Sequence, residues 1–359
     1  MTDKRRAWLV MLAVYLAGVA VALNQAKVPP VMGVLVAQLH VDLTTGGWLM
    51  SAFAVAGVVL GLPAAFILMR FGPKATGLAA LGCTLAGSVV GALATNAAVL
   101  LAGRVIEGVG LALIGVVAPA VISQWFPPLE RGTPMGLWAS WVPVGMVVIY
   151  NLAGPLSGRF GWQSLWWFGT LVALVAFVVY AAVVRSPSPA GRAEPPADLR
   201  ASGLGFIFNP ASWILALVFA AVNFAMNGYA TWLPAYLGQA QALPPAQANF
   251  VASLSNLSVI ASVILAGRLL DRTRNRRQVL SAALLVSGLL LVWCFSLTPA
   301  TMMPYQLMLG AAVGFIPAAV FTLAPETMPC PRPGHRFRRQ REDSRRERCP
   351  GRGQGWRWA

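Results

Sequence analysis

Long apolar stretches separated by short polar segments run along most of the chain. Stretches of roughly 20 or more apolar residues, long enough to cross a bilayer, occur at about 8–38, 48–69, 75–94, 98–124, 134–157, 164–184, 211–237, 247–269, 278–297 and 302–325. This pattern predicts an all-α membrane protein with ten transmembrane helices. Pro29 and Pro30 lie inside the first stretch, and because proline has no backbone N–H we expect a kink there.

The second half of the chain repeats the first at an offset of 202 residues. Residues 48–51 (WLMS) match 250–253 (FVAS), and Gly108 matches Gly310. Two similar halves in parallel order are typical of secondary transporters. We therefore expect a six-helix N-terminal half at 1–184, a cytoplasmic linker at 185–208 and an incomplete C-terminal half of four helices at 209–328. Two helices of an expected twelve would be missing.

The composition changes abruptly after Met328. Residues 329–359 contain ten Arg, no Lys and no apolar periodicity. Such a segment is either a disordered basic tail attracted to anionic lipid or out-of-frame translation of a GC-rich gene. We favour the second interpretation, because the segment replaces sequence that the repeat calls for. The alternative to a working transporter is then a truncated, non-transporting membrane protein.

Charge along the chain predicts how it sits in the membrane. Hydrophobic residues make up 57% of the chain and charged residues 11%, against about a quarter charged residues in soluble domains. The net charge of +16 suggests a nucleic-acid partner, but ten of the 27 basic residues lie in the last 31. Fourteen others lie in one set of alternate loops and Arg159 alone in the other set.

This segregation predicts a multi-pass protein of a bacterial-type plasma (inner) membrane with both ends cytoplasmic. The partners expected are the lipid bilayer and a small-molecule substrate, with or without a proton, and no nucleic acid. Four tryptophans would lie in the outer aromatic belt, namely Trp48, Trp162, Trp166 and Trp167. With four Cys, two His and no zinc-site spacing or ATP-binding motif, we expect a protein that is not an enzyme and has no cofactor or metal. We also expect it to be a monomer.

Three short motifs resemble those of the major facilitator superfamily. The loop after the second stretch keeps Arg70, Gly72 and Lys74 of that family's Gly-x-x-x-Asp-Arg-x-Gly-x-Lys/Arg pattern but lacks its Asp, while the second copy keeps Asp271 and Arg272. The resemblance implies a major facilitator-type helical bundle that rocks two halves about a central site. It assigns the five residues to a cytoplasmic gating loop.

The other two motifs lie on the fourth and fifth stretches. Residues 104–110 read RVIEGVG, with Glu where the family usually has Gln, and Gly154, Pro155 and Gly158 match a helix-packing motif. Within the superfamily, residues 23–29 (LNQAKVP) and 232–234 (WLP) are similar to the cyanate and 2-nitroimidazole permease group. The resemblance implies secondary active transport of a small solute, with a small anion preferred. A drug efflux carrier is the alternative within the class.

Lys27, Arg104 and Glu107 are the only charged residues deep inside the apolar stretches. A charge in the bilayer centre costs about 3 kcal/mol or more unless it is paired or faces water. Counting along the helices puts Lys27 and Glu107 at similar depth, which predicts an ion pair. The pair either only locks the first helix to the fourth, or Lys27 or Arg104 attracts an anionic substrate while Glu107 couples protons.

Uncharged polar residues inside the stretches are further candidates for substrate contact. Asn223 and Asn227 lie one turn apart on the seventh stretch, and hydrogen bonding between helices is an equally good interpretation. Gln306 takes the place of Arg104 in the second copy. Asn24, which precedes Lys27 by three residues, completes the set.

Overall fold

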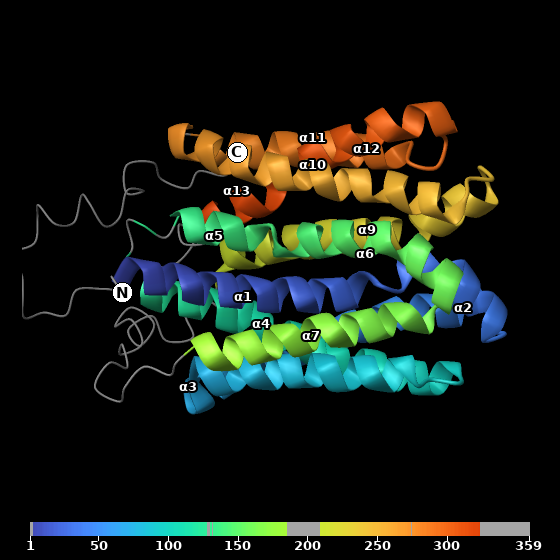
Figure 1. Cartoon of the computed structure of the whole chain (residues 1–359). Coiled ribbons are helices and arrows are strands. Elements are labelled where there is room, and N and C mark those ends of the chain that lie inside the picture. Colours follow the sequence, from blue (N-terminus) through green and yellow to red (C-terminus); the bar gives the residue numbers. More distant parts are fainter. Residues whose placement is uncertain (1–2, 128–129, 131, 185–208, 274, 324–359) are drawn as a thin grey trace, which may run out of the picture.

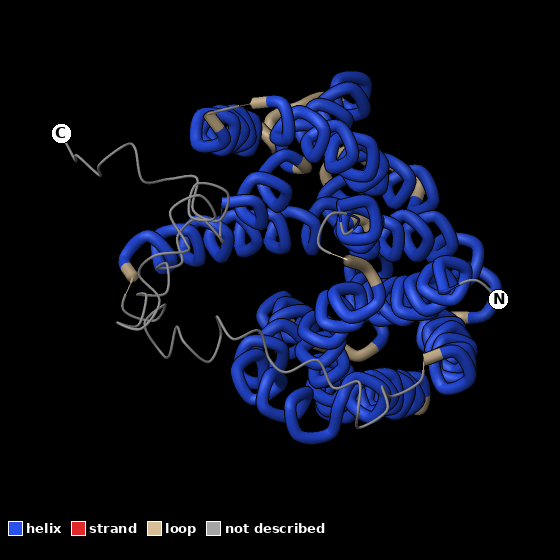
Figure 2. The backbone as a smooth tube through the Cα atoms, turned by 90° about the vertical axis from the view of Figure 1, so that its left-hand side faces the viewer, coloured by secondary structure: helices blue, strands red, loops and turns tan. Residues whose placement is uncertain are grey.

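The computed structural model describes residues 3–127, 130, 132–184, 209–273 and 275–323. Every regular element in these ranges is a helix (Figures 1 and 2). The first helix group comprises α1 (Asp3–Ala26), the 3₁₀ helix η1 (Pro29–Val31), α2 (Met32–Gln38), α3 (Leu43–Ala92), α4 (Ala97–Trp125), α5 (Gly132–Ala139), α6 (Trp141–Phe160) and α7 (Gln163–Val183). The second helix group comprises α9 (Pro210–Gln239), α10 (Pro245–Arg272), α11 (Arg276–Val292), α12 (Pro299–Val313) and α13 (Phe315–Leu323).

The helical membrane fold predicted from the apolar pattern is confirmed. Nine segments of the described chain are helical, long and apolar enough to cross a membrane. The predicted stretch at 278–297 is shorter than expected, because α11 has 17 residues and ends at Val292. A helix of that length spans about 25 Å, less than a bilayer core of about 30 Å. The expected basic tail at 329–359 lies outside the described residues.

The first apolar stretch is broken where its two prolines stand. α1 ends at Ala26, and Pro29 and Pro30 begin the separate η1 turn. In an unbroken helix the N–H of residue 29 would bond to the carbonyl of Gln25, but proline has no N–H to donate. The predicted kink is therefore a full interruption that leaves a backbone carbonyl to be paired elsewhere.

A second interruption separates the two spans within α3. Gly72 has φ 76° and ψ 170°, a conformation that glycine adopts without steric cost. Arg70 is exposed and Lys74 half-buried beside it, and Thr76 Oγ1 donates to the Gly72 carbonyl at 2.8 Å. The backbone conformation thus favours glycine at position 72 of the loop motif.

Helix starts in the second group follow those in the first at the offset seen in the sequence. α3 begins at Leu43 and α10 at Pro245, and α4 begins at Ala97 and α12 at Pro299. Both pairs of starting residues are 202 positions apart. The internal repeat is therefore a repeat of helices.

One close helix contact is also repeated. A Cβ added at Gly108 would collide with the Phe53 carbonyl oxygen, and one added at Gly310 would collide with the Ser255 carbonyl oxygen. Each residue of the second pair lies 202 positions after its counterpart. Glycine is needed at both positions because the two backbones approach closely there.

The described residues form three hydrophobic clusters, one of which contains residues of both helix groups. In Figure 1, α3, α4 and α7 lie on one side of α1, and α10 to α13 lie beyond α6 and α9. The shared cluster contains buried residues of both groups, among them Val28, Ile149, Leu233 and Val251. Of the two others, one contains only first-group residues and the second only second-group residues. The shared cluster includes the end of α1, away from the end that carries the N-terminus.

Candidate functional site: a buried cluster of three charges

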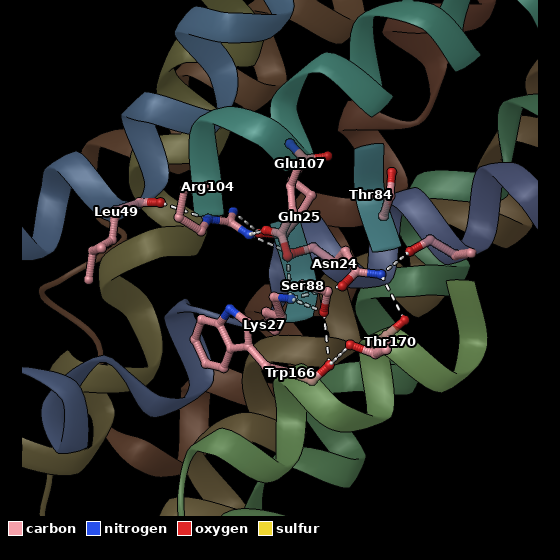
Figure 3. Close-up of polar contacts among 12 residues, drawn as sticks. Asn24, Gln25, Lys27, Leu49, Thr84, Ser88, Arg104, Glu107, Trp166 and Thr170 are labelled. Carbon is pink, nitrogen blue, oxygen red and sulfur yellow. Dashed lines mark hydrogen bonds and ion pairs between the residues drawn. The ribbon is translucent and has the colours of Figure 1, made fainter. Parts of the chain in front are cut away.

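Lys27, Arg104 and Glu107 meet inside the first helix group (Figure 3). Lys27 Nζ lies 2.5 Å from Glu107 Oε1, and Arg104 Nη1 lies 2.5 Å from Glu107 Oε2. All three side chains are fully buried. The ion pair predicted between Lys27 and Glu107 is confirmed, and Arg104 extends it to a triad in which one carboxylate bridges two cations.

Side-chain oxygens hold the Lys27 ammonium in place. Its Nζ donates to Asn24 Oδ1 and to Ser88 Oγ, each at 2.8 Å, as well as to Glu107. An ammonium has three N–H donors, so each has an acceptor. The ring of Trp166 lies 4.8 Å from Nζ and adds a cation–π contact. Asn24, a predicted site residue, therefore belongs to the cluster.

Arg104 is held chiefly by backbone carbonyls. Its Nε donates to Leu49 O at 2.9 Å, Nη1 to Asn24 O at 2.7 Å and Nη2 to Gln25 O at 2.9 Å. The Gln25 carbonyl is the one that Pro29 leaves without a helical donor. Arg104 thus caps the broken end of α1 and ties it to α3 and α4.

Glycines allow the helices to approach this closely. A Cβ at Gly87 would lie 2.5 Å from Gly103 O and 2.7 Å from Glu107 Cγ, and one at Gly169 would collide with Asn24 Oδ1. Small residues at such contacts let backbones pack tightly in membrane proteins. The spacing of Gly87 and Gly91, four residues apart, is the sequence signal that could have indicated this contact.

Ser88 and Trp166 are cluster residues that the sequence reasoning missed. Ser88 Oγ accepts from Lys27 and donates to Trp166 O at 2.8 Å. Of the four tryptophans predicted for the outer aromatic belt, Trp48 and Trp167 are exposed, but the prediction is wrong for Trp162 and Trp166, which are 1% and 0% exposed. Their rings pack edge to face, 5.0 Å apart, so they belong to the protein interior.

The second helix group carries an uncharged counterpart of the triad. Gln306 occupies the position 202 residues after Arg104, and its Nε2 donates to the Tyr229 hydroxyl at 2.5 Å. Tyr229 in turn lies 202 residues after Lys27. The repeat therefore places the neutral Tyr229–Gln306 pair at the positions that correspond to the two cations of the triad. Tyr229 could have been found from the sequence by applying the offset to Lys27.

Asn223 and Asn227 lie apart from these pairs. Asn223 Nδ2 donates to Phe219 O and Asn227 Nδ2 to Asn223 O, each at 2.8 Å. Both bonds run along α9 rather than to a neighbouring helix, so the interhelical bonding considered for these side chains is wrong. Asn223 is exposed and Asn227 half-buried.

The helix-packing motif on α6 is only partly in contact with the second group. A Cβ at Gly154 would lie 3.2 Å from Ala246 Cα at the start of α10, whereas Pro155 and Gly158 are exposed. Nearby, Asn151 Nδ2 donates to Ser253 Oγ at 3.1 Å. Gly154 therefore lies on the surface where the two helix groups meet.

A separate apolar cavity of ≈ 320 Å³ opens between α2 and α9. Its lining includes Met32, Val36, Trp232, Tyr236 and Phe295, and none of the charged triad. The lining carries no charged side chain.

Two comparisons agree with this architecture. Residues 14–336 match the family described as Major Facilitator Superfamily, which is most of the chain. The chain belongs to the major facilitator superfamily. Its structure is similar to that titled "Crystal structure of D-xylose-proton symporter", with a TM-score of 0.70, 16% sequence identity and coverage of 89% of this chain and 83% of the other. At that identity the likeness establishes the fold.

Relatives among curated proteins are named as transporters. The "Uncharacterized MFS-type transporter YhcA" of Bacillus subtilis (strain 168) is 30% identical over 47% of this chain and 33% of its own length. The "Hexuronate transporter" of the same organism is 23% identical, over 71% of this chain and 61% of its own length. The "Probable galactarate/D-glucarate transporter GudP" is 27% identical, over 70% and 63%. The chain spans about a third of the first of these relatives and less than two thirds of the others.

Proposed function

We propose that the protein is a secondary transporter of a small organic anion, recognised through the buried triad. The cluster brings together two basic side chains and one carboxyl with no exposure to water, so that it carries one net positive charge when all three are ionised. Burial of an uncompensated charge is costly, and an anion entering the site would neutralise it. The relatives named for hexuronate and for galactarate and D-glucarate, all carboxylates, support this substrate class.

Lys27 rather than Arg104 is the residue that would receive the anion. Arg104 is fixed by three backbone carbonyls, which cannot turn away without moving helices. Lys27 is held by the side chains of Asn24, Ser88 and Glu107, each of which has rotatable bonds. A substrate carboxylate would therefore take the place of one of these side-chain acceptors at Lys27.

Glu107 is the group through which a proton would couple to the anion. If Glu107 takes up a proton, the triad changes from one net positive charge to two and the carboxylate loosens its hold on Lys27. Anion binding then becomes stronger, and by reciprocity the bound anion favours protonation of Glu107. The two species would bind together, as symport requires.

Transport would proceed by rocking the halves at 1–184 and 209–328 against each other. The shared hydrophobic cluster joins them at one end and separate clusters serve each group elsewhere, which supports a hinge of this kind. We place the end with the N-terminus, Gly72 and the 185–208 linker in the cytoplasm of a bacterial-type inner membrane, because basic residues concentrate in those loops. The finer similarity to cyanate and 2-nitroimidazole permeases remains a prediction.

Uptake by proteoliposomes that contain the purified 359-residue chain tests the proposal. Galacturonate should accumulate when the side from which it enters is made acidic, whereas galactose should not. Cyanate added as a competitor tests the finer similarity. Absence of galacturonate uptake by folded protein would contradict the proposal and support the non-transporting alternative. Movement of a neutral drug instead would support the drug efflux alternative.

A further inference from the structure

The pair formed by Tyr229 and Gln306 is the strongest unexplained polar feature of the second helix group. Gln306 is 0% exposed and Tyr229 is 5% exposed. Gln306 Nε2 donates to the Tyr229 hydroxyl, with Met302 Sδ at 3.7 Å as a weaker contact. Its Oε1 is buried and has no hydrogen-bond partner among the described residues. A buried amide oxygen without a donor is destabilising, so its retention calls for an explanation.

The position of the Tyr229–Gln306 pair offers an explanation for the unpaired amide oxygen. Tyr229 and Gln306 stand 202 residues after Lys27 and Arg104, on the helices that repeat those of the triad. Tyr229 and Met302 also belong to the hydrophobic cluster that contains Leu23, Ala26 and Val28 from around the end of α1. Tyr229 thus packs in the same hydrophobic cluster as the end of α1, from the opposite helix group.

The two pairs offer complementary chemistry. The triad has an excess of positive charge and suits a carboxylate, whereas the unpaired Oε1 of Gln306 is an acceptor and suits an O–H or N–H donor. A ligand that satisfies both carries a carboxylate and, some distance along its chain, a hydrogen-bond donor. A hydroxyl is the simplest such donor on a small organic acid.

We propose that Gln306, positioned by Tyr229, reads a hydroxyl group of the substrate, so that the transporter selects hydroxycarboxylates over their deoxy counterparts. This inference rests on the proposed function, since it assumes that the carboxylate is held at Lys27. It adds a specificity-determining residue in the second helix group. The Tyr229 hydroxyl orients the Gln306 amide, so that Oε1 is left for the ligand.

Equilibrium binding of two six-carbon dicarboxylates to the purified full chain tests the inference. Galactarate and adipate have the same length and charge, but only galactarate carries hydroxyls. Wild type should bind galactarate about tenfold more tightly, the effect of satisfying one buried acceptor. Gln306→Met should lower galactarate affinity to that of adipate and leave adipate affinity unchanged.

Two further variants keep the result interpretable. Tyr229→Phe removes only the hydroxyl that orients the amide, so it should reduce the preference for galactarate in part. Gln241→Met is the matched control, because Gln241 also has a buried Oε1 without a partner among the described residues but donates to Leu297 O, away from the pair. It should leave the preference intact.

Three results would overturn the inference. Equal binding of galactarate and adipate by wild type, or an unchanged preference in Gln306→Met, would remove the role of Gln306 while leaving the anion site standing. Binding of neither acid by folded wild-type protein would instead contradict the proposed function, and the inference would fall with it.

Discussion

The triad in the first helix group and the Tyr229–Gln306 pair in the second occupy equivalent positions but differ in charge. Lys27 and Arg104 share Glu107 at 2.5 Å each, whereas Tyr229 and Gln306 share one hydrogen bond. The repeat preserved the backbone geometry, since Gly108 and Gly310 each abut a carbonyl 55 residues earlier in the chain, of Phe53 and Ser255 respectively. The comparison teaches that one repeated scaffold can carry an ionic cluster in one helix group and a neutral hydrogen-bonded pair in the other.

Removing the bridging carboxylate should have the largest effect on stability. Glu107→Gln leaves Lys27 and Arg104 as buried cations without a counter-charge and should lower the free energy of unfolding by about 3–5 kcal/mol. Thermal unfolding in detergent measures the loss. Glu130→Gln is the control, because Glu130 pairs with Lys4 at 3.2 Å on the surface and its loss should cost about 0–1 kcal/mol.

The double variant sharpens this result. Lys27→Met together with Glu107→Gln leaves Arg104 as the single cation, so its loss of stability should be smaller than the sum of the two single losses. Additive losses would show that Lys27 and Glu107 do not interact in the folded protein.

Disrupting the repeated glycine contact should lower stability by a smaller amount, and by the same amount in the two helix groups. Gly108→Ala and Gly310→Ala each place a methyl group against a carbonyl oxygen of a neighbouring helix, and overpacking of this kind costs about 1–3 kcal/mol. Gly115→Ala is the control on α4, since a Cβ there meets nothing within 4 Å. Loss at Gly108 without loss at Gly310 in the same unfolding assay would show that the second group lacks the repeated contact.

Tyr229→Phe should weaken the neutral pair by less than Glu107→Gln weakens the charged one. The variant leaves the ring in place but removes the acceptor of the buried Gln306 Nε2, and an uncharged buried donor that loses its acceptor costs about 1–3 kcal/mol. The difference in stability loss between the two variants, measured in one unfolding assay, shows how much more the ionic cluster contributes to stability than the neutral pair. A loss from Tyr229→Phe as large as that from Glu107→Gln would contradict the distinction drawn between them.

The smallest expected change in stability comes from the N-terminal ends of the repeated helices α3 and α10. Asp42 caps α3 through Thr45 N–H, 2.9 Å from Oδ1, whereas its counterpart Pro244 has no side-chain cap. Hydrogen bonds from the side chain and backbone of Thr45 hold the pKa of Asp42 below its ordinary value. Because the folded pKa lies below the unfolded one, the cap stabilises above the unfolded value of about 4 and is lost as the pH falls through the folded value.

Asp42→Ala should therefore be slightly less stable than wild type at neutral pH and equally stable in strong acid. Thermal unfolding of the two proteins across that range checks the sign. A difference that grows toward acid would mean that Asp42 is stabilised in its protonated form.

The sequence predicted the spans and the central ion pair because both follow from the cost of charge in an apolar environment. Lys27 and Glu107 stood out as charges inside apolar stretches, and their depth followed from counting residues along helices. The partners that complete the site did not stand out, since Ser88 and Trp166 are ordinary residues of membrane helices. They became visible only once folding placed α3 and α7 beside α1.

Arg104 shows where such reasoning reaches its limit. Its burial and charge suggested a role at the substrate, yet its guanidinium binds the carbonyls of Asn24, Gln25 and Leu49. The Pro29 break that frees the Gln25 carbonyl was predictable from the sequence. Which cation would cap it depended on how α4 packs against the end of α1.

The charge of the triad is the central claim, and a comparison of matched ligands tests it most directly. Equilibrium binding of galacturonate and galactose, which differ in charge, would be measured for wild type, Lys27→Met and the surface control Lys4→Met. We expect wild type and Lys4→Met to prefer the anion, and Lys27→Met, whose site has no net charge, to lose that preference by about tenfold or more. An anion preference that persists in Lys27→Met, or equal binding of the two sugars by wild type, would contradict the account.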